Sequence, residues 1–141
     1  MKIKAFSIIE IIFILAIISI ILVVALPKTK DIFAKANTTQ IKTTIALIRE
    51  GIVKEKNRLF LANSMENLHS LDDGDTNLFK KVLSTPIIEI DTPKANGWIR
   101  VSNNSYKIYL NDTESVVFNY DPNSYSFDCN FNEPLCKELT H

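Results

Sequence analysis

The chain has 141 residues, 46% of them hydrophobic, and its 16 basic and 16 acidic residues give a formal net charge of zero. That length suits a single domain, and the balanced charge gives no electrostatic footprint for nucleic acid. The sequence has two isolated histidines, no glycine-rich phosphate loop and no nucleophile-base pattern, so we predict no enzyme activity and no cofactor.

The first predicted element is an apolar helix near the N-terminus. Residues Ile11 to Leu26 carry no charge, and Ser19 is the only polar side chain among them. At about 1.5 Å per residue, a helix from Phe6 to Leu26 is roughly 30 Å long, the thickness of the hydrocarbon core of a bilayer. We therefore expect residues 6–27 to span a membrane once and residues 28–141 to form one soluble domain.

An acidic residue, Glu10, lies between the basic start of the chain, Lys2 and Lys4, and the apolar run. A removable signal peptide has a basic start and an apolar centre, but its pattern does not include an acid at this point. A plain membrane anchor gains nothing from a carboxylate, which costs about 2.5 to 3.5 kcal/mol at the bilayer centre. Glu10 therefore calls for another interpretation.

The stretch KAFSIIE, Lys4 to Glu10, resembles the processing site of type IV pilins and type II secretion pseudopilins. The resemblance makes residues 1–5 a leader peptide, with cleavage between Ala5 and Phe6 and N-methylation of Phe6. Glu10 is then the fifth mature residue. Pro27 falls where many type IV pilins carry a proline that perturbs the helix. Ala5 departs from the family pattern, which normally has glycine at that position.

The resemblance implies a structural subunit processed by a prepilin peptidase. With other pilin or pseudopilin subunits and an inner-membrane assembly platform, it would form a pseudopilus or pilus-like filament for protein secretion or DNA uptake. Glu10 would neutralise the Phe6 amine of a neighbouring subunit, because a buried charge is tolerated only when paired. The subunit would cross the inner membrane once, with its N-terminus cytoplasmic and its C-terminal domain periplasmic, and the filament would be periplasmic or at the cell surface.

Two alternatives from other classes remain open. One is a single-pass, membrane-anchored periplasmic binding or sensor domain that does not polymerise, for which Phe6 and Glu10 would be incidental. The other is an exported soluble protein that loses its signal peptide. The N-terminus of the mature protein distinguishes all three interpretations.

The soluble region begins with a predicted amphipathic helix over residues 28–62. Its apolar stripe consists of Ile41, Ile45, Ile48 and Ile52, which recur at helical spacing. Gly51 weakens this helix slightly. Residues 63–96 are predicted to be an irregular connection with a short helix at Asn77–Leu83.

A β-meander is predicted over residues 97–128, and its strands are separated by turn residues. The expected strand runs are Trp98–Val101, Tyr106–Leu110, Val116–Tyr120 and Tyr125–Phe127. Pattern and resemblance together predict an α+β pilin fold. In this fold a long N-terminal helix, membrane-spanning in its first half, packs on an antiparallel meander of about four strands.

Two cysteines, Cys129 and Cys136, lie near the end of the chain with six residues between them. This spacing is too wide for a CxxC redox or zinc motif, so we predict a structural disulfide that closes a loop over residues 129–136. A disulfide requires an oxidising compartment, which agrees with export.

Metal binding is not predicted. The acidic stretch Asp72–Asn77 lacks the glycine at the sixth position that an EF-hand loop needs, and an exposed acidic turn explains it better. Some major pseudopilins bind calcium in a C-terminal loop. Asp112, Asp121 and Asp128 would be the candidate ligands here, but nothing in the sequence supports them.

Overall fold

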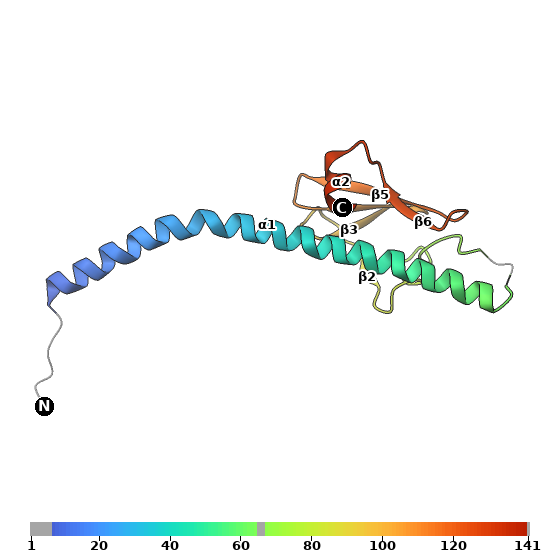
Figure 1. Ribbon diagram of the computed structural model, residues 1–141, viewed down its shortest axis with the longest axis horizontal. Coiled ribbons are helices and arrows are strands. Elements are labelled where there is room, and N and C mark those ends of the chain that lie inside the picture. Colours follow the sequence, from blue (N-terminus) through green and yellow to red (C-terminus); the bar gives the residue numbers. More distant parts are fainter. Residues whose placement is uncertain (1–6, 65–66, 141) are drawn as a thin grey trace, which may run out of the picture. The chain divides into compact units, whose positions relative to one another are not determined.

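The structure is a computed structural model that describes residues 7–64 and 67–140, apart from the side chains of residues 24–34. Figure 1 shows the elements in chain order. They are α1 (Ile8–Leu61), β1 (Asn77–Leu78), β2 (Ile87–Ile88), β3 (Trp98–Ser102), β4 (Ser105–Tyr109), β5 (Ser115–Asp121), β6 (Ser126–Cys129) and α2 (Pro134–Thr140). The chain divides into two compact units, Met1–Ala36 and Asn37–His141, and α1 contributes to both.

In the first unit, α1 begins directly after Ser7. The Ser7 carbonyl oxygen accepts hydrogen bonds from the backbone N–H groups of Glu10, at 3.0 Å, and Ile11, at 3.2 Å. Glu10 therefore lies in the first turn, where a negative charge interacts favourably with the helix dipole. The helix includes position 27, and the proposed perturbation by Pro27 stays a prediction.

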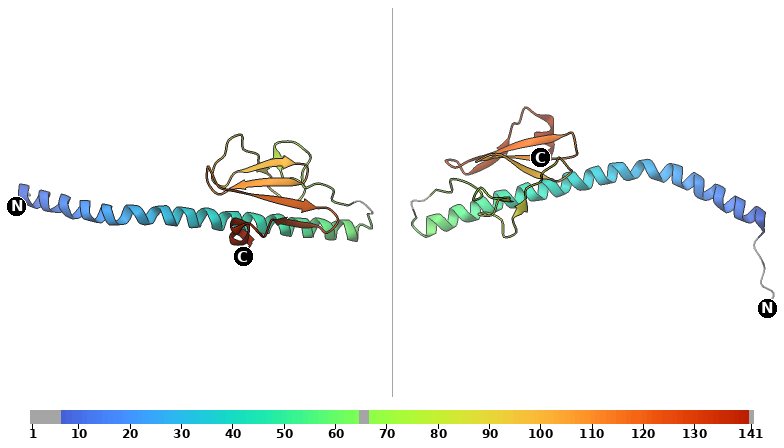
Figure 2. Two further views of the ribbon diagram at one scale, coloured as in Figure 1. Left: turned by 90° about the horizontal axis from the view of Figure 1, so that it is seen from above. Right: turned by 180° about the vertical axis from the view of Figure 1, so that it is seen from behind.

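The second unit is built on the part of α1 that follows Ala36. Its four-stranded sheet lies along this part of the helix in Figures 1 and 2. The predicted isoleucine stripe faces the interior, with Ile48 fully buried and the other three isoleucines at most 2% exposed. The core also includes aromatic side chains from the sheet and its connections, namely Phe79, Trp98, Tyr106, Phe118, Tyr120 and Phe127.

The sheet is an antiparallel meander in the order β3-β4-β5-β6. Burial alternates along β4, where Tyr106 and Ile108 are buried and the residues between and beside them are partly exposed. In the register, Tyr106 lies opposite Phe118, and Ile108 lies opposite Val116. The four predicted strand runs are confirmed to within two residues, because a strand with one buried face leaves a period of two in its sequence.

The short helix predicted at Asn77–Leu83 is wrong. Asn77 and Leu78 form β1 and pair antiparallel with Ile88 and Ile87 of β2. Phe79 then has a positive φ of 59°, which a right-handed helix cannot include. Because Leu78 and Phe79 are both fully buried, packing against the core decides this conformation.

Gly51 allows a close approach between α1 and the connection that follows β1. A Cβ atom placed on Gly51 would lie 2.2 Å from the carbonyl oxygen of Val82. Only glycine fits this contact without a backbone shift. Gly51, which lowers the helix propensity of this segment, therefore has a packing role.

The predicted membrane span is not found. Where the structure describes side chains, no helix is both long and apolar enough to cross a membrane. The predicted fold class is wrong on this point, and so are the predicted transmembrane helix and the single-pass inner-membrane location.

A second helix, α2, lies within the predicted disulfide loop and just beyond it, where no helix was predicted. It begins at Pro134, and proline is favoured in the first turn because the fixed φ suits a helix and the missing N–H costs nothing there. Cys136 and Leu139 are its buried residues. Figure 2 shows α2 beside the second half of α1, so this short helix covers part of that half.

Candidate functional site

The most unusual surface of the described chain is the N-terminal part of α1, residues Ile8–Val23, which we call the apolar segment. Its large apolar side chains are exposed on every side of the helix, from 44% at Ile14 to 79% at Ile8. Ser19 satisfies its own hydroxyl by donating to the Leu15 carbonyl oxygen at 2.8 Å. A helix that is apolar all round is normally buried, so this segment requires a partner.

Glu10 is exposed in the first turn of the apolar segment and is its only charged residue. Transferring the segment into an apolar environment would bury this carboxylate, which is tolerated only with a partner of opposite charge. The other residues predicted to act with Glu10, Ala5 and Phe6, lie outside the described residues. Their roles in cleavage and methylation stay predictions.

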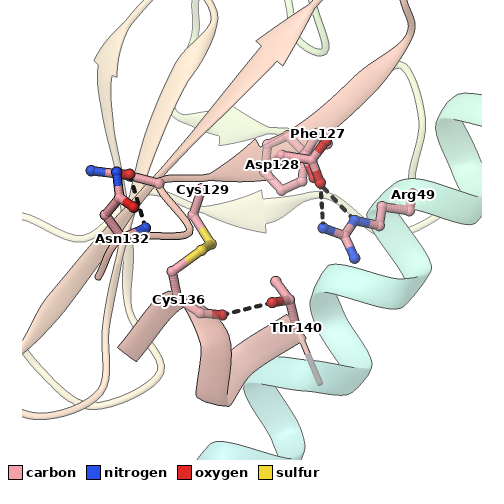
Figure 3. Close-up of a disulfide and its surroundings, with 8 residues drawn as sticks. Arg49, Phe127, Asp128, Cys129, Asn132, Cys136 and Thr140 are labelled. Carbon is pink, nitrogen blue, oxygen red and sulfur yellow. Dashed lines mark hydrogen bonds and ion pairs between the residues drawn. A yellow bond between two sulfur atoms is a disulfide. The ribbon is translucent and has the colours of Figure 1, made fainter. Parts of the chain in front are cut away.

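The predicted disulfide between Cys129 and Cys136 is confirmed. It joins the end of β6 to α2, and both cysteines are buried in the core (Figure 3). The Thr140 hydroxyl donates to the Cys136 carbonyl oxygen one turn earlier at 2.8 Å, which satisfies the hydroxyl. The disulfide therefore holds the C-terminal helix on the sheet.

One ion pair joins α1 to the edge of the sheet next to the disulfide. The Arg49 guanidinium donates through Nη2 to Asp128 Oδ1 at 2.7 Å and through Nε to the Phe127 carbonyl oxygen at 3.0 Å (Figure 3). Both side chains are about 40% exposed, so solvent screens the pair and its contribution to stability is small. Its main effect is to occupy a carbonyl of the edge strand β6.

A polar pocket of about 480 Å³ lies between the connection after α1 and the turn that joins β3 to β4. We call it the hairpin pocket. Its wall is formed by His69, Ser70, Asp72, Asp73, Gly74, Lys81, Arg100, Asn103 and Asn104. Sequence analysis did not identify this site, because its residues come from segments about thirty positions apart and match no motif.

Asp72 lines the hairpin pocket and is only 4% exposed, so the exposed acidic turn expected over Asp72–Asn77 is wrong at this residue. Its Oδ2 accepts a hydrogen bond from the Tyr106 hydroxyl at 2.7 Å. Its Oδ1 accepts from the Gly74 N–H at 3.1 Å and lies 3.2 Å from Arg100 Nη2. A buried carboxylate is stable only with such partners, so Asp72 fixes the connection after α1 to the sheet.

Burial raises the pKa of the Tyr106 hydroxyl well above its usual value, and the hydrogen bond to the Asp72 carboxylate raises it further. Tyr106 and Arg100 lie opposite each other in the β3–β4 register. The strand pattern predicts that Tyr106 is buried, but no local signal in the sequence indicates that Asp72 is its partner.

Several acidic residues that the calcium interpretation considered bind other groups of the chain. Asp75 Oδ1 accepts the Asn77 N–H at 2.9 Å, and this bond is the main cause that lowers the Asp75 pKa. Asp121 accepts from the Ser124 hydroxyl at 2.7 Å in the β5–β6 turn. Among the side chains that the structure describes, no three acidic, histidine or cysteine residues form a group that could hold a metal ion.

In comparisons with known proteins, no family model, curated protein or solved structure matches the chain.

Proposed function

We propose that this chain is a pilin-like structural subunit, processed by a prepilin peptidase, that polymerises into a filament through its apolar segment. The observation that carries the proposal is the exposure of large apolar side chains on every side of that segment. At about 25 cal/mol per Å² of apolar surface removed from water, burying so many large side chains provides a strong driving force for association. Packing against the same segment of other subunits would supply that burial.

Glu10 has a specific role in this assembly. Cleavage between Ala5 and Phe6 would create a new amine at Phe6, close to the start of α1. In a filament core that excludes water, this amine and a carboxylate from the next subunit would each be costly alone and tolerable as a pair. The pairing would also set the register between neighbouring subunits.

Mass spectrometry of the mature protein tests the proposed cleavage and methylation at its N-terminus. The expected species begins with N-methylated Phe6. A mature protein that starts at Met1 or at Leu26 would contradict processing by a prepilin peptidase.

Assembly is tested separately with Glu10→Ala, and Glu50→Ala serves as a matched control. Glu50 is an exposed glutamate on the same helix, outside the apolar segment. Loss of one partner of a buried ion pair costs about 3 to 5 kcal/mol per contact, so Glu10→Ala should be processed normally but should not polymerise. Glu10→Gln should restore assembly only poorly, because it carries no charge, and Glu50→Ala should assemble like the wild type.

Polymer is measured by shearing and by cross-linking of the overexpressed subunit. Normal filaments from fully processed Glu10→Ala protein would defeat the charge-pairing role. Failure of the wild-type chain itself to polymerise after processing would defeat the proposed function.

A further inference from the structure

The two residues that precede β3, Asn96 and Gly97, form the only asparagine-glycine pair in the sequence. Asn96 has a positive φ of 62°, a conformation that asparagine tolerates better than most residues. A Cβ atom on Gly97 would lie 2.1 Å from Ile90 Cδ1 and 3.0 Å from the Lys94 carbonyl oxygen, which favours glycine there. The fold therefore favours both residues, although the pair is chemically reactive because no side chain shields the glycine nitrogen.

The folded chain holds the three groups that react when Asn96 deamidates. The Gly97 N–H, whose nitrogen would attack, donates to the Lys94 carbonyl oxygen at 3.0 Å. The Asn96 Nδ2 group, which would leave as ammonia, donates to two side chains of α1, Asn37 Oδ1 at 3.2 Å and Gln40 Oε1 at 3.0 Å. Asn96 Oδ1 is buried and has no hydrogen-bond partner among the described residues. Negative charge would develop on this oxygen in the tetrahedral intermediate, and a buried charge without a donor is costly.

We propose that Asn96 is a site of spontaneous deamidation that the fold protects, so that modification occurs only when the turn at residues 94–97, the Asn96 turn, opens. In the open turn the Gly97 nitrogen loses its proton to water or hydroxide and attacks Asn96 Cγ. A C–N bond forms, the bond from Cγ to Nδ2 breaks, and the amide group leaves as ammonia after taking a proton from water. Water then adds to the cyclic imide and gives aspartate or isoaspartate. The reaction needs only water and does not depend on filament assembly.

Either product prevents the Asn96 turn from docking as before. A carboxylate donates no hydrogen bond, so the bonds to Asn37 and Gln40 are lost. Isoaspartate also lengthens the backbone between two hydrogen bonds to β4. The Asn96 N–H donates to the Tyr109 carbonyl oxygen at 2.8 Å, and the Tyr109 N–H donates to the Gly97 carbonyl oxygen at 3.0 Å. A chain that deamidates while open is therefore changed irreversibly, with this turn less firmly attached to β4 and α1.

The test compares the folded and the unfolded full chain at the same mildly alkaline pH, with a mild detergent in both samples because the apolar segment is exposed. Peptide mapping by mass spectrometry measures the loss of intact Asn96, and the other asparagines in each digest serve as internal references. In urea, with the disulfide reduced, Asn96 should be converted faster than any other asparagine. In the folded chain its conversion should be at least about tenfold slower, because it requires local opening.

Gln40→Ala tests a protecting contact without changing the reactive pair. Gln40 is exposed on α1, and its removal deletes one of the two hydrogen bonds that hold the Asn96 amide. The folded variant should deamidate about two- to tenfold faster than the wild type, since losing a hydrogen bond shifts the opening equilibrium by about that factor. In urea the two rates should be equal. Glu50→Ala, at an exposed position elsewhere on α1, is the matched control and should deamidate like the wild type.

Four outcomes would overturn the inference. An unchanged rate in folded Gln40→Ala would exclude a protecting role for this hydrogen bond. Equal normalised rates in folded and unfolded wild-type chain would show that the fold does not protect Asn96. Asn96 that stays intact in urea while other asparagines convert would exclude it as a preferred site. Deamidated chain, separated by anion exchange and refolded, should unfold at a lower urea concentration than intact chain, and an unchanged midpoint would show that the turn docks as before.

Discussion

Two parts of α1 differ both in their sequences and in their surroundings. In the apolar segment, Ile14 is 44% exposed, and its neighbours around the helix are exposed as well. In the second unit, Ile48 is fully buried, because the sheet covers one face of the helix. The first part is apolar on all sides, whereas the second carries charged residues such as Glu50 and Lys54 on its open face. A helix that is apolar on all sides leaves apolar surface exposed, whereas a helix with one apolar stripe can bury that stripe against a single sheet.

The largest expected effect comes from replacing an isoleucine by alanine in each of the two parts of α1. Ile48→Ala should lower the free energy of unfolding by about 2 to 5 kcal/mol, because it leaves a cavity in the core. Ile14→Ala should leave the unfolding free energy unchanged and weaken only self-association. Urea unfolding followed by circular dichroism measures the first effect, and sedimentation measures the second. Equal destabilisation by both changes would contradict the contrast between the two parts.

The disulfide is specific to the second unit, so removing it should not affect the apolar segment. Cys129→Ser should lower the unfolding free energy by about 2.5 kcal/mol on the chain-entropy estimate. In cells the chain should become less abundant, and the proposed cleavage before Phe6 should be unaffected. Urea unfolding measures the loss of stability, and alkylation of nonreduced wild-type protein checks the bond itself. Reactive thiols in that protein would refute the disulfide.

Tyr106→Phe tests the contact that ties the connection after α1 to the sheet. Loss of a hydrogen bond to the buried Asp72 carboxylate should cost about 2 kcal/mol at neutral pH.

The same residue gives the protein a dependence on alkaline pH. The folded chain keeps Tyr106 protonated, whereas the unfolded chain loses this proton near the ordinary tyrosine pKa of about 10. Stability is therefore fully present below pH ~10 and should fall as the pH rises above it. Tyr106→Phe should reduce this slope without abolishing it, because burial also raises the pKa of Tyr120 to about 12. An unchanged slope in the variant would show that Tyr106 does not titrate in this way.

The smallest expected effect concerns Gly51, where helix propensity and packing oppose each other. Replacing glycine by alanine inside a helix normally stabilises it by about 1 kcal/mol. Here the new methyl group would collide with the Val82 carbonyl oxygen, and overpacking costs about 1 to 3 kcal/mol. Gly51→Ala should therefore destabilise the second unit by about 1 kcal/mol, as measured by thermal unfolding. A stabilised variant would show that the connection moves away freely.

The sequence by itself determined the features that depend on local periodicity. The stripe from Ile41 to Ile52 and the four strands of the meander follow from spacings of 3.6 and 2 residues, which a helix and a half-buried strand impose on any sequence. The disulfide also followed from the sequence, because two cysteines so close in the chain have few other partners. The same reasoning failed for the membrane span, since no helix in the part of the chain with described side chains is long and apolar enough to cross a membrane.

Only the tertiary structure decided the features that depend on contacts between distant segments. The β1–β2 pair replaced a predicted helix because Leu78 and Phe79 both enter the core. Position 51 requires glycine because the Val82 carbonyl oxygen lies so close to it. The hairpin pocket forms because Asp72 contacts Arg100 and Tyr106 on the sheet. Such contacts leave no periodic pattern in the sequence. They are favourable only in the folded chain, where each buried polar group needs a hydrogen-bond partner.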